Sequence, residues 1–406
     1  MSGKLRVAAV FGTRPDAVKM APVVHALSSD ERFECITIAT AQHREMLDEV
    51  LRLFEVKPVY DLEVMTEGQT LTDVTTRVLE RMSSVLRDAK PDVVLVHGDT
   101  TTSTAAALAS YYRKIPVGHV EAGLRTDTIY EPFPEEMNRR LTGVIAQHHF
   151  APTPLARQNL LLEGKKPDSI VVTGNTVIDA FLWVHARLRA EDKFELGTGG
   201  SQSRLIFVEA HRRENLGAPM ESICRALADV VRRHDDVSII WPVHPNPEVV
   251  EVVRRILDGT PRVQLVQPME YRKLVGAIGR ATIVATDSGG LQEEAPCLGK
   301  PVLVLRRVTE RPEGVAAGTL ELVGTDKATI VAALDRLLDD EAAYQRMARA
   351  ANPYGDGKAS ERIAASLLAS YRSGKAPTEF DPSLPPTLPS SARSAIGEPP
   401  GKPVKH

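Results

Sequence analysis

Several residues that could transfer protons stand just after short apolar runs of the sequence. Asp99 and Glu121 each follow such a run, and His211 follows another in the second half. Glu135 comes soon after Glu121, beside Glu136, at a helix start marked by two prolines. A carboxylate just past a buried strand needs a partner or a function, since burying it unpaired is costly. Together these groups suit acid/base catalysis. Asp99 could instead cap the next helix, and one glutamate could serve only the helix dipole.

A second set of residues is suited to holding a nucleotide. Ser288-Gly289-Gly290 opens a helix after an apolar run, where free backbone N–H groups could bind phosphate. Glu294, one turn later, could accept hydrogen bonds from ribose hydroxyls. Basic residues and one more histidine near strand ends complete the set: Arg14, Lys19, Arg139, Arg212, His244 and Arg311. Each alone is a weak signal, and a lone histidine is more often structural than functional.

Composition narrows the classes of function. The chain has 406 residues, with 50 Lys and Arg against 53 Asp and Glu, so its net charge of −3 provides no field that attracts nucleic acid or an anionic membrane. The start lacks a secretory signal and no apolar run could span a bilayer, so we expect a cytoplasmic protein. Three scattered cysteines indicate neither disulfides nor a zinc site. Without a GxGxxG fingerprint or a metal-ligand cluster, we expect no cofactor and no metal.

The elements that must position these residues follow a repeating pattern. Short β-branched runs alternate with longer amphipathic stretches, which predicts βα units around buried parallel sheets. Predicted strands of the first series are 5–10, 35–40, 93–97, 116–120, 148–151 and 170–173, and those of the second are 204–208, 237–242, 263–266, 282–286, 301–305 and 320–323. We therefore predict an α/β fold with two Rossmann-like doubly wound domains facing a cleft. Ligands sit at the carboxyl ends of such strands.

Domain limits follow from the same pattern. We expect an N-terminal Rossmann-like domain over residues 1–175 and a C-terminal, nucleotide-binding one over 176–357. A helix over 358–373 is expected to pack back. Proline and serine dominate residues 374–406, which we expect to be disordered.

Taken together and in order, the motifs resemble those of one family. The segments FGTRPDAVKMAP, HGDTTTS, HVEAGLRT, FPEEMNRR, VTGNTVIDA, HRREN, DSGGLQEEAPCLGKPV and TERPEGVAAGT are similar to those of the non-hydrolysing UDP-N-acetylglucosamine (UDP-GlcNAc) 2-epimerases. The match covers about residues 5 to 370. It implies the glycosyltransferase-B architecture, a homodimer, a UDP-sugar substrate and a place in cell-surface polysaccharide biosynthesis. The implied reaction interconverts UDP-GlcNAc and UDP-N-acetylmannosamine (UDP-ManNAc) through a 2-acetamidoglucal intermediate.

The resemblance also assigns roles to matching positions. It makes Asp99, Glu121, Glu135 and His211 catalytic. Positions that hold the nucleotide or its diphosphate are Arg14, Lys19, Arg139, His244, Ser288, Gly289, Gly290, Glu294 and Arg311.

Departures from the family pattern leave alternatives open. Arg307 and Glu131 replace commoner residues, which leaves the sugar substituents open, since related enzymes act on UDP-2,3-diacetamido-glucuronate. A glycosyltransferase of the same fold, a hydrolysing epimerase and a sugar-nucleotide-binding protein are further alternatives. Thr13-Arg14-Pro15-Asp16 favours retention of UDP over hydrolysis, because hydrolysing relatives usually continue GTR with Ala-Asp. A binding protein would leave the clustered carboxylates unexplained.

One family property is expected to be weakened here. Many members bind a second UDP-GlcNAc as an effector, using a Gln-His-Arg-Gln segment and an Arg before Gln-Thr-Leu. This chain has Gln42-His43-Arg44-Glu45 and Gly68-Gln69-Thr70-Leu71 instead. We therefore expect weak effector binding, because two charged or polar contacts to a dianion are lost.

Overall fold

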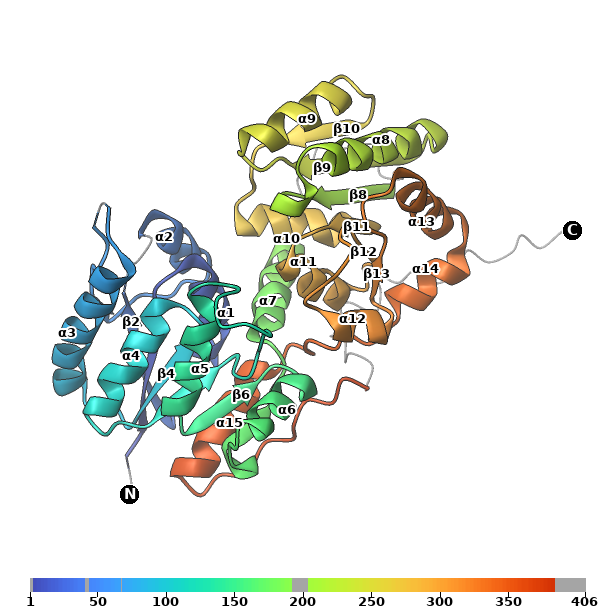
Figure 1. The fold of residues 1–406 in the computed structure, drawn as a ribbon. Coiled ribbons are helices and arrows are strands. Elements are labelled where there is room, and N and C mark those ends of the chain that lie inside the picture. The colour runs from blue at the N-terminus through green and yellow to red at the C-terminus, as the bar shows by residue number, and fades with distance from the viewer. Residues whose placement is uncertain (1–2, 41–43, 67, 192–203, 384–406) are drawn as a thin grey trace, which may run out of the picture.

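The computed structural model describes residues 3–40, 44–66, 68–191 and 204–383. Two parallel sheets with alternating helices form two lobes (Figure 1). The predicted α/β class with two doubly wound domains is confirmed. Runs rich in β-branched residues form most of the strands, and central strands such as β1 (Leu5–Phe11) and β9 (Val237–Pro242) are buried almost throughout.

The first sheet has the order β3-β2-β1-β4-β5-β6-β7. Its strands are β1 (Leu5–Phe11), β2 (Phe33–Ala39), β3 (Tyr60–Asp61), β4 (Val93–His97), β5 (Val117–Val120), β6 (His148–Ala151) and β7 (Ile170–Val172). Its helices are α1 (Arg14–Ser28), α2 (Arg44–Leu53), α3 (Leu71–Ala89), α4 (Thr101–Tyr112), α5 (Glu135–Ile145) and α6 (Pro154–Leu162). Strand β3 was not predicted, because two residues carry no periodicity. The strand order reverses between β1 and β4, so the loops after these strands open a crevice.

The second sheet has the order β10-β9-β8-β11-β12-β13. Its strands are β8 (Arg204–Glu209), β9 (Val237–Pro242), β10 (Val263–Val266), β11 (Ile283–Thr286), β12 (Val302–Val304) and β13 (Leu320–Leu322). Its helices are α8 (Ala218–Arg233), α9 (Pro247–Leu257), α10 (Tyr271–Arg280), α11 (Gly289–Glu294), α12 (Pro312–Ala317), α13 (Lys327–Asp339) and α14 (Glu341–Ala348). Here the order reverses between β8 and β11, which gives a second crevice.

The chain passes between the lobes at two places that touch each other. The backbone N–H of Asn175 donates to the carbonyl of Tyr354 over 2.6 Å. Gly174 has φ +84°, and a Cβ there would lie 3.2 Å from the Cα of Gly355. Helix α7 (Thr176–Ala190) follows and packs against α1 of one lobe and α10 of the other. The boundaries after residues 175 and 357 stay predictions.

The segment after the second crossing returns to the N-terminal lobe. Helix α15 (Ala359–Tyr371) packs against α1, and Figure 1 shows it within the N-terminal lobe. The expectation of disorder from residue 374 onward is wrong for residues 374–383. Phe380 is buried, its backbone N–H donates to the Val172 carbonyl, and Glu379 pairs with Arg157. The Arg362 guanidinium adds a hydrogen bond to the Thr378 carbonyl, so side-chain and backbone contacts together hold this proline-containing segment. Residues 384–406 lie outside the described part of the chain.

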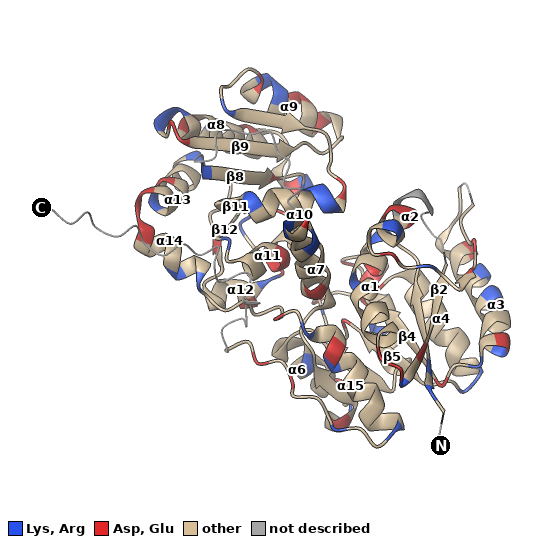
Figure 2. Ribbon diagram, turned by 180° about the vertical axis from the view of Figure 1, so that it is seen from behind, with Lys and Arg blue, Asp and Glu red and all other residues tan. Residues whose placement is uncertain are grey.

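The surface carries mixed charge. Figure 2 shows Lys and Arg interspersed with Asp and Glu along outer helices such as α3, α9 and α13. This agrees with the small net charge. Among the described helices, none is both long and apolar enough to cross a membrane.

Candidate active site

A cavity of about 500 Å³ lies at the carboxyl ends of β4 and β5. It brings together three of the predicted acid/base residues, Asp99, Glu121 and Glu135, with Arg139 beside them. Asp99 and Glu121 are close because their strands are neighbours in the sheet. Glu135 and Arg139 come from the first turns of α5, which covers the same sheet edge.

Glu121 is the most tightly held of these carboxylates. Its Oε1 accepts from Lys19 Nζ at 2.6 Å and from Asn175 Nδ2 at 3.0 Å, and its Oε2 lies 3.0 Å from His97 Nε2. Burial alone would raise the pKa of Glu121, but the charges of Lys19 and His97 outweigh it and hold that pKa well below its usual range. Its backbone has φ +62°, a strained conformation for a non-glycine residue. Strain of this kind is commonest at functional sites.

Asp99 forms an ion pair, and yet its pKa lies above the usual value. Arg139 Nη2 donates to its Oδ2 at 2.5 Å. Burial nevertheless raises the pKa of Asp99, with the nearby Glu121 charge acting in the same direction. The alternative that Asp99 only caps the next helix does not describe this structure. The N-cap of α4 is Thr100, whose hydroxyl accepts from the Ser103 backbone N–H.

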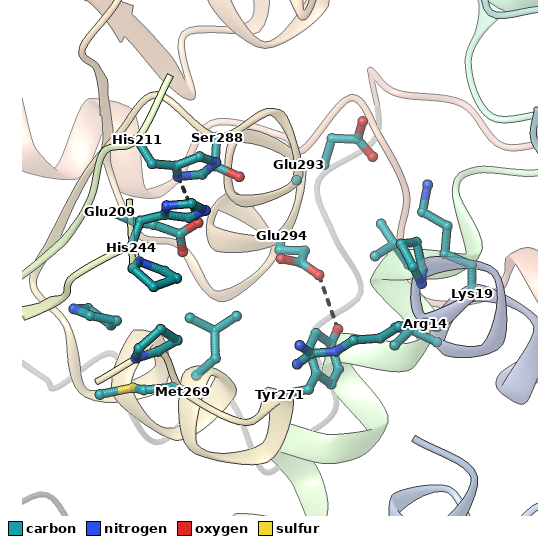
Figure 3. A pocket seen from close by; sticks show the side chains of 18 of the residues that line it. Arg14, Lys19, Glu209, His211, His244, Met269, Tyr271, Ser288, Glu293 and Glu294 are labelled. Atoms are coloured by element: carbon teal, nitrogen blue, oxygen red, sulfur yellow. Dashed lines mark hydrogen bonds and ion pairs between the residues drawn. The ribbon is translucent and has the colours of Figure 1, made fainter. Parts of the chain in front are cut away.

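A second cavity, of about 650 Å³, lies at the carboxyl edge of the second sheet (Figure 3). Eight of the predicted residues line it: Arg14, Lys19, His211, His244, Ser288, Gly290, Glu294 and Arg311. Pro268, Met269 and Tyr271 add an apolar wall. The mixture of an apolar wall and convergent cations suits a nucleotide.

His211 is fixed by its backbone and by a neighbouring ring. The Asp287 carboxylate accepts from the backbone N–H groups of His211 and Arg212 at 2.9 and 2.8 Å. The imidazoles of His211 and His244 stack with centroids 5.0 Å apart, as Figure 3 shows. Burial lowers the pKa of His211. The Asp287 charge acts to raise that pKa, and the His244 charge acts to lower it. A neutral imidazole near physiological pH can accept or donate a proton.

Two carboxyl groups in this cavity hold protons unusually tightly. The carboxyl of Glu294 accepts from the Tyr271 hydroxyl at 3.1 Å, the dashed contact in Figure 3, and burial raises its pKa to about 8. Burial also raises the pKa of Glu209 to about 7, helped by the Asp287 charge. Glu209 Oε1 lies 3.7 Å from His211 Nδ1.

Gly289 and Arg212 line neither cavity, but both lie close to Arg311, which lines the two of them. A Cβ on Gly289 would come within 3.6 Å of Arg311 Nη2 and 3.9 Å of Arg212 Nη2. Both guanidinium groups therefore lie at the start of α11, where a glycine leaves space for an anion.

The two cavities join into one cleft between the lobes. Pro15, Lys19 and Arg311 line both of them. His97, Asn175, Glu209, Tyr271 and Glu293 also contribute to the site, although sequence reasoning did not select them. His97 opens the HGDTTTS motif and ends β4, whereas Glu209 ends β8 two residues before HRREN, and these positions were a usable signal. Among the described residues, no group of three or more His, Cys, Asp or Glu could hold a metal ion.

Comparison with known proteins identifies the family. The model of the UDP-N-acetylglucosamine 2-epimerase family matches residues 25–368. The UDP-N-acetylglucosamine 2-epimerase of Escherichia coli K12 is 54% identical over 369 residues, which cover 89% of this chain and 98% of the relative. The chain belongs to the UDP-N-acetylglucosamine 2-epimerase family.

Solved structures of the family agree with the fold. A putative UDP-GlcNAc 2-epimerase from Listeria monocytogenes has a TM-score of 0.86 and 46% identity, covering 93% of this chain and 100% of its own. The Neisseria meningitidis enzyme, solved with UDP-GlcNAc bound, has a TM-score of 0.80 and 46% identity, covering 90% of this chain and 100% of its own. The two-lobed architecture of this chain is thus that of the epimerase family.

Proposed function

We propose that this chain catalyses the reversible 2-epimerisation of UDP-GlcNAc and UDP-ManNAc. The observation that carries the proposal is the joining of two cavities at Lys19 and Arg311. One cavity gathers three carboxylates suited to proton transfer, and the other gathers cations and an apolar wall suited to a nucleotide. Both are present in a chain whose family relatives are named for this reaction.

The chemistry requires elimination before the proton at C2 can leave. No carbonyl adjoins C2, so its hydrogen becomes acidic only as the C1–O bond to UDP breaks. A base takes the C2 proton while UDP departs with the C1–O electron pair, leaving 2-acetamidoglucal. Return of a proton to the opposite face of C2, with UDP adding back at C1, gives the epimer. The site therefore needs acid/base groups on both faces of the sugar.

The residues of the cleft can meet both needs. Arg14, Arg212 and Arg311 would stabilise the negative charge of departing UDP. Asp99, Glu121, Glu135 and His211 would supply acid/base groups around the sugar. The raised pKa of Asp99 supports an acid role for that carboxyl, and the lowered pKa of Glu121 supports a base role for the other.

The second candidate is epimerisation of a related sugar such as UDP-2,3-diacetamido-glucuronate. The two departures that raise it are Arg307 and Glu131, and both are exposed and line neither cavity. This favours UDP-GlcNAc. A glycosyltransferase is less favoured, since the carboxylate cluster then lacks a role.

One incubation tests the proposal. Purified protein with UDP-GlcNAc in heavy water, with neither NAD nor metal added, should form UDP-ManNAc with deuterium at C2, as read by NMR. Free N-acetylmannosamine would instead indicate a hydrolysing enzyme. An absence of exchange at C2, or a strict need for NAD, would refute the proposal.

We also propose a homodimer formed through α4 and α5. These helices pack side by side and expose apolar side chains, Tyr111 and Tyr112 on one and Leu141 and Val144 on the other. A cluster of exposed apolar residues on adjacent helices is typical of a subunit interface. Cytoplasmic location and a role in cell-surface polysaccharide biosynthesis stay predictions.

A further inference from the structure

Asn175 stands at the first crossing between the lobes, and its side chain has partners on both sides. Its Nδ2 donates to Glu121 Oε1 at 3.0 Å and to Glu293 Oε2 at 2.7 Å. Its Oδ1 accepts from the backbone N–H of Val177 at 3.1 Å, which caps α7. The side chain is buried, so all its hydrogen-bonding atoms are used within the protein.

An amide is the group that fits between two buried carboxylates. Its two N–H bonds can serve one carboxylate each, and it adds no charge. Glu121 directly follows β5 of the N-terminal sheet and lines the smaller cavity, whereas Glu293 belongs to α11 and lines the larger one. The amide thus joins the two halves of the cleft at the point where the chain crosses.

The charges around Glu121 come from several elements. They are Lys19 on α1, His97 at the end of β4, Asp99 just after it, Glu293 on α11, and Arg311 before α12. Arg311 Nε donates to Glu293, so that carboxylate is paired on its other side. The Asn175 amide is the neutral link in this set.

We propose that Asn175 is a positioning residue that ties the Glu121 carboxylate of one lobe to Glu293 of the other and holds it ready for proton transfer. The inference rests on the proposed function, because it takes Glu121 as an acid/base group. Loss of the link should alter turnover and its pH dependence. Substrate affinity should change little, since Asn175 lines neither cavity.

Two substitutions separate this role from helix capping. Serine and aspartate cap helices about as well as asparagine, so Asn175→Ser and Asn175→Asp both keep the cap and remove the amide N–H groups. We expect Asn175→Ser to lower kcat about tenfold or more, with KM for UDP-GlcNAc within about threefold. Asn175→Asp adds a carboxylate beside Glu121 and should shift the acid limb of kcat/KM upward by roughly one pH unit or more.

A cap elsewhere in the fold provides the matched control. Asp326 caps α13 by accepting from the Thr329 backbone N–H at 2.9 Å, away from the cleft. Asp326→Ala should lower the melting temperature and leave the pH profile unchanged. The Asn175 variants could instead only lower the melting temperature, while their folded fraction keeps the kcat and the pH profile of the wild type. Asn175 would then be only a helix cap, and the inference would be wrong.

Two reference enzymes distinguish this failure from that of the proposed function. Wild-type enzyme should epimerise UDP-GlcNAc, and Glu121→Gln should lose about 100-fold or more in turnover. If either expectation fails, the assignment of Glu121 fails, and the inference with it. If both hold while the Asn175 variants keep the wild-type profile, the inference alone fails.

Discussion

Glu135 and Glu136 are neighbours in the sequence but occupy opposite environments. Glu135 lines the smaller cavity, and its buried Oε2 has no hydrogen-bond partner within the described residues. Glu136 is fully buried, accepting from Arg140 Nε at 2.7 Å and from the Thr126 backbone N–H at 3.1 Å. One therefore faces the reaction space and the other ties α5 to the preceding loop.

The first prediction uses this pair. Glu135→Gln should lower turnover about 100-fold or more at an unchanged melting temperature, because an acid/base group is lost without loss of a structural contact. Glu136→Gln should cost stability, about 1.5 kcal/mol, because it weakens the charge-assisted hydrogen bond from the partly exposed Arg140. Steady-state rates and thermal melts on both variants check this. Near-normal turnover of Glu135→Gln would show that Glu135 serves only the helix start.

The second prediction concerns pH and substrate affinity. The pKa of Glu209 is raised to about 7, so this carboxyl is neutral at lower pH and becomes negative as pH rises through that value. The ionised form places a negative charge in the cavity proposed for a nucleotide diphosphate. KM for UDP-GlcNAc should therefore rise above pH 7 in the wild type.

Glu209→Gln is the matched test, because glutamine is neutral at every pH and has the same size. Its KM should rise less than that of the wild type between pH 7 and 9. Equal KM profiles for the two proteins would contradict the assignment. Glu294, whose pKa is raised to about 8 mainly by burial, ionises in both proteins, and at somewhat lower pH in Glu209→Gln because the Glu209 charge helps to raise that pKa.

The third prediction concerns the segment that was expected to be disordered. Phe380→Ala should lower the free energy of unfolding by about 3 kcal/mol, because it empties the site that this ring fills near Gly174. Thr378→Ala is the control, since Thr378 is exposed and contributes only its carbonyl, to Arg362. Chemical denaturation of both variants measures the difference. Equal midpoints would mean that the Phe380 ring adds nothing to stability.

The fourth prediction tests the proposed dimer. Val144→Glu should shift the protein toward monomer in light scattering, because a charge would be buried at an apolar interface. Leu162→Glu alters an equally exposed residue on α6 and should leave the assembly unchanged. A monomeric wild type, or a dimer that resists Val144→Glu, would rule out this face.

The fifth prediction concerns the effector. UDP-ManNAc freed of UDP-GlcNAc should be converted without a lag and with hyperbolic kinetics, because Glu45 and Gly68 replace an amide and a guanidinium. Gln42 and His43 lie outside the described residues, so this prediction rests on sequence. A lag relieved by a trace of UDP-GlcNAc would show that the effector site survives.

The sequence by itself determined most strands of the two sheets and the proximity of Asp99 and Glu121 in the smaller cavity. Val93–His97 and Val237–Pro242 have the predicted bounds, because buried parallel strands read as continuous β-branched runs. Asp99 and Glu121 could be expected to lie together, since each ends a strand of the same predicted sheet. The motifs named the family because they occur together and in order.

Only the tertiary structure decided which of these groups interact across the molecule. Asn175 and Glu293 are 118 residues apart, and their contact depends on how one lobe lies against the other. The roles of Glu135 and Glu136 differ only because α5 turns one into the cavity and the other into the core. Phe380 shows the same limit, because composition reports only the average polarity of a segment, whereas this ring, like Glu379, finds its partners in distant parts of the chain.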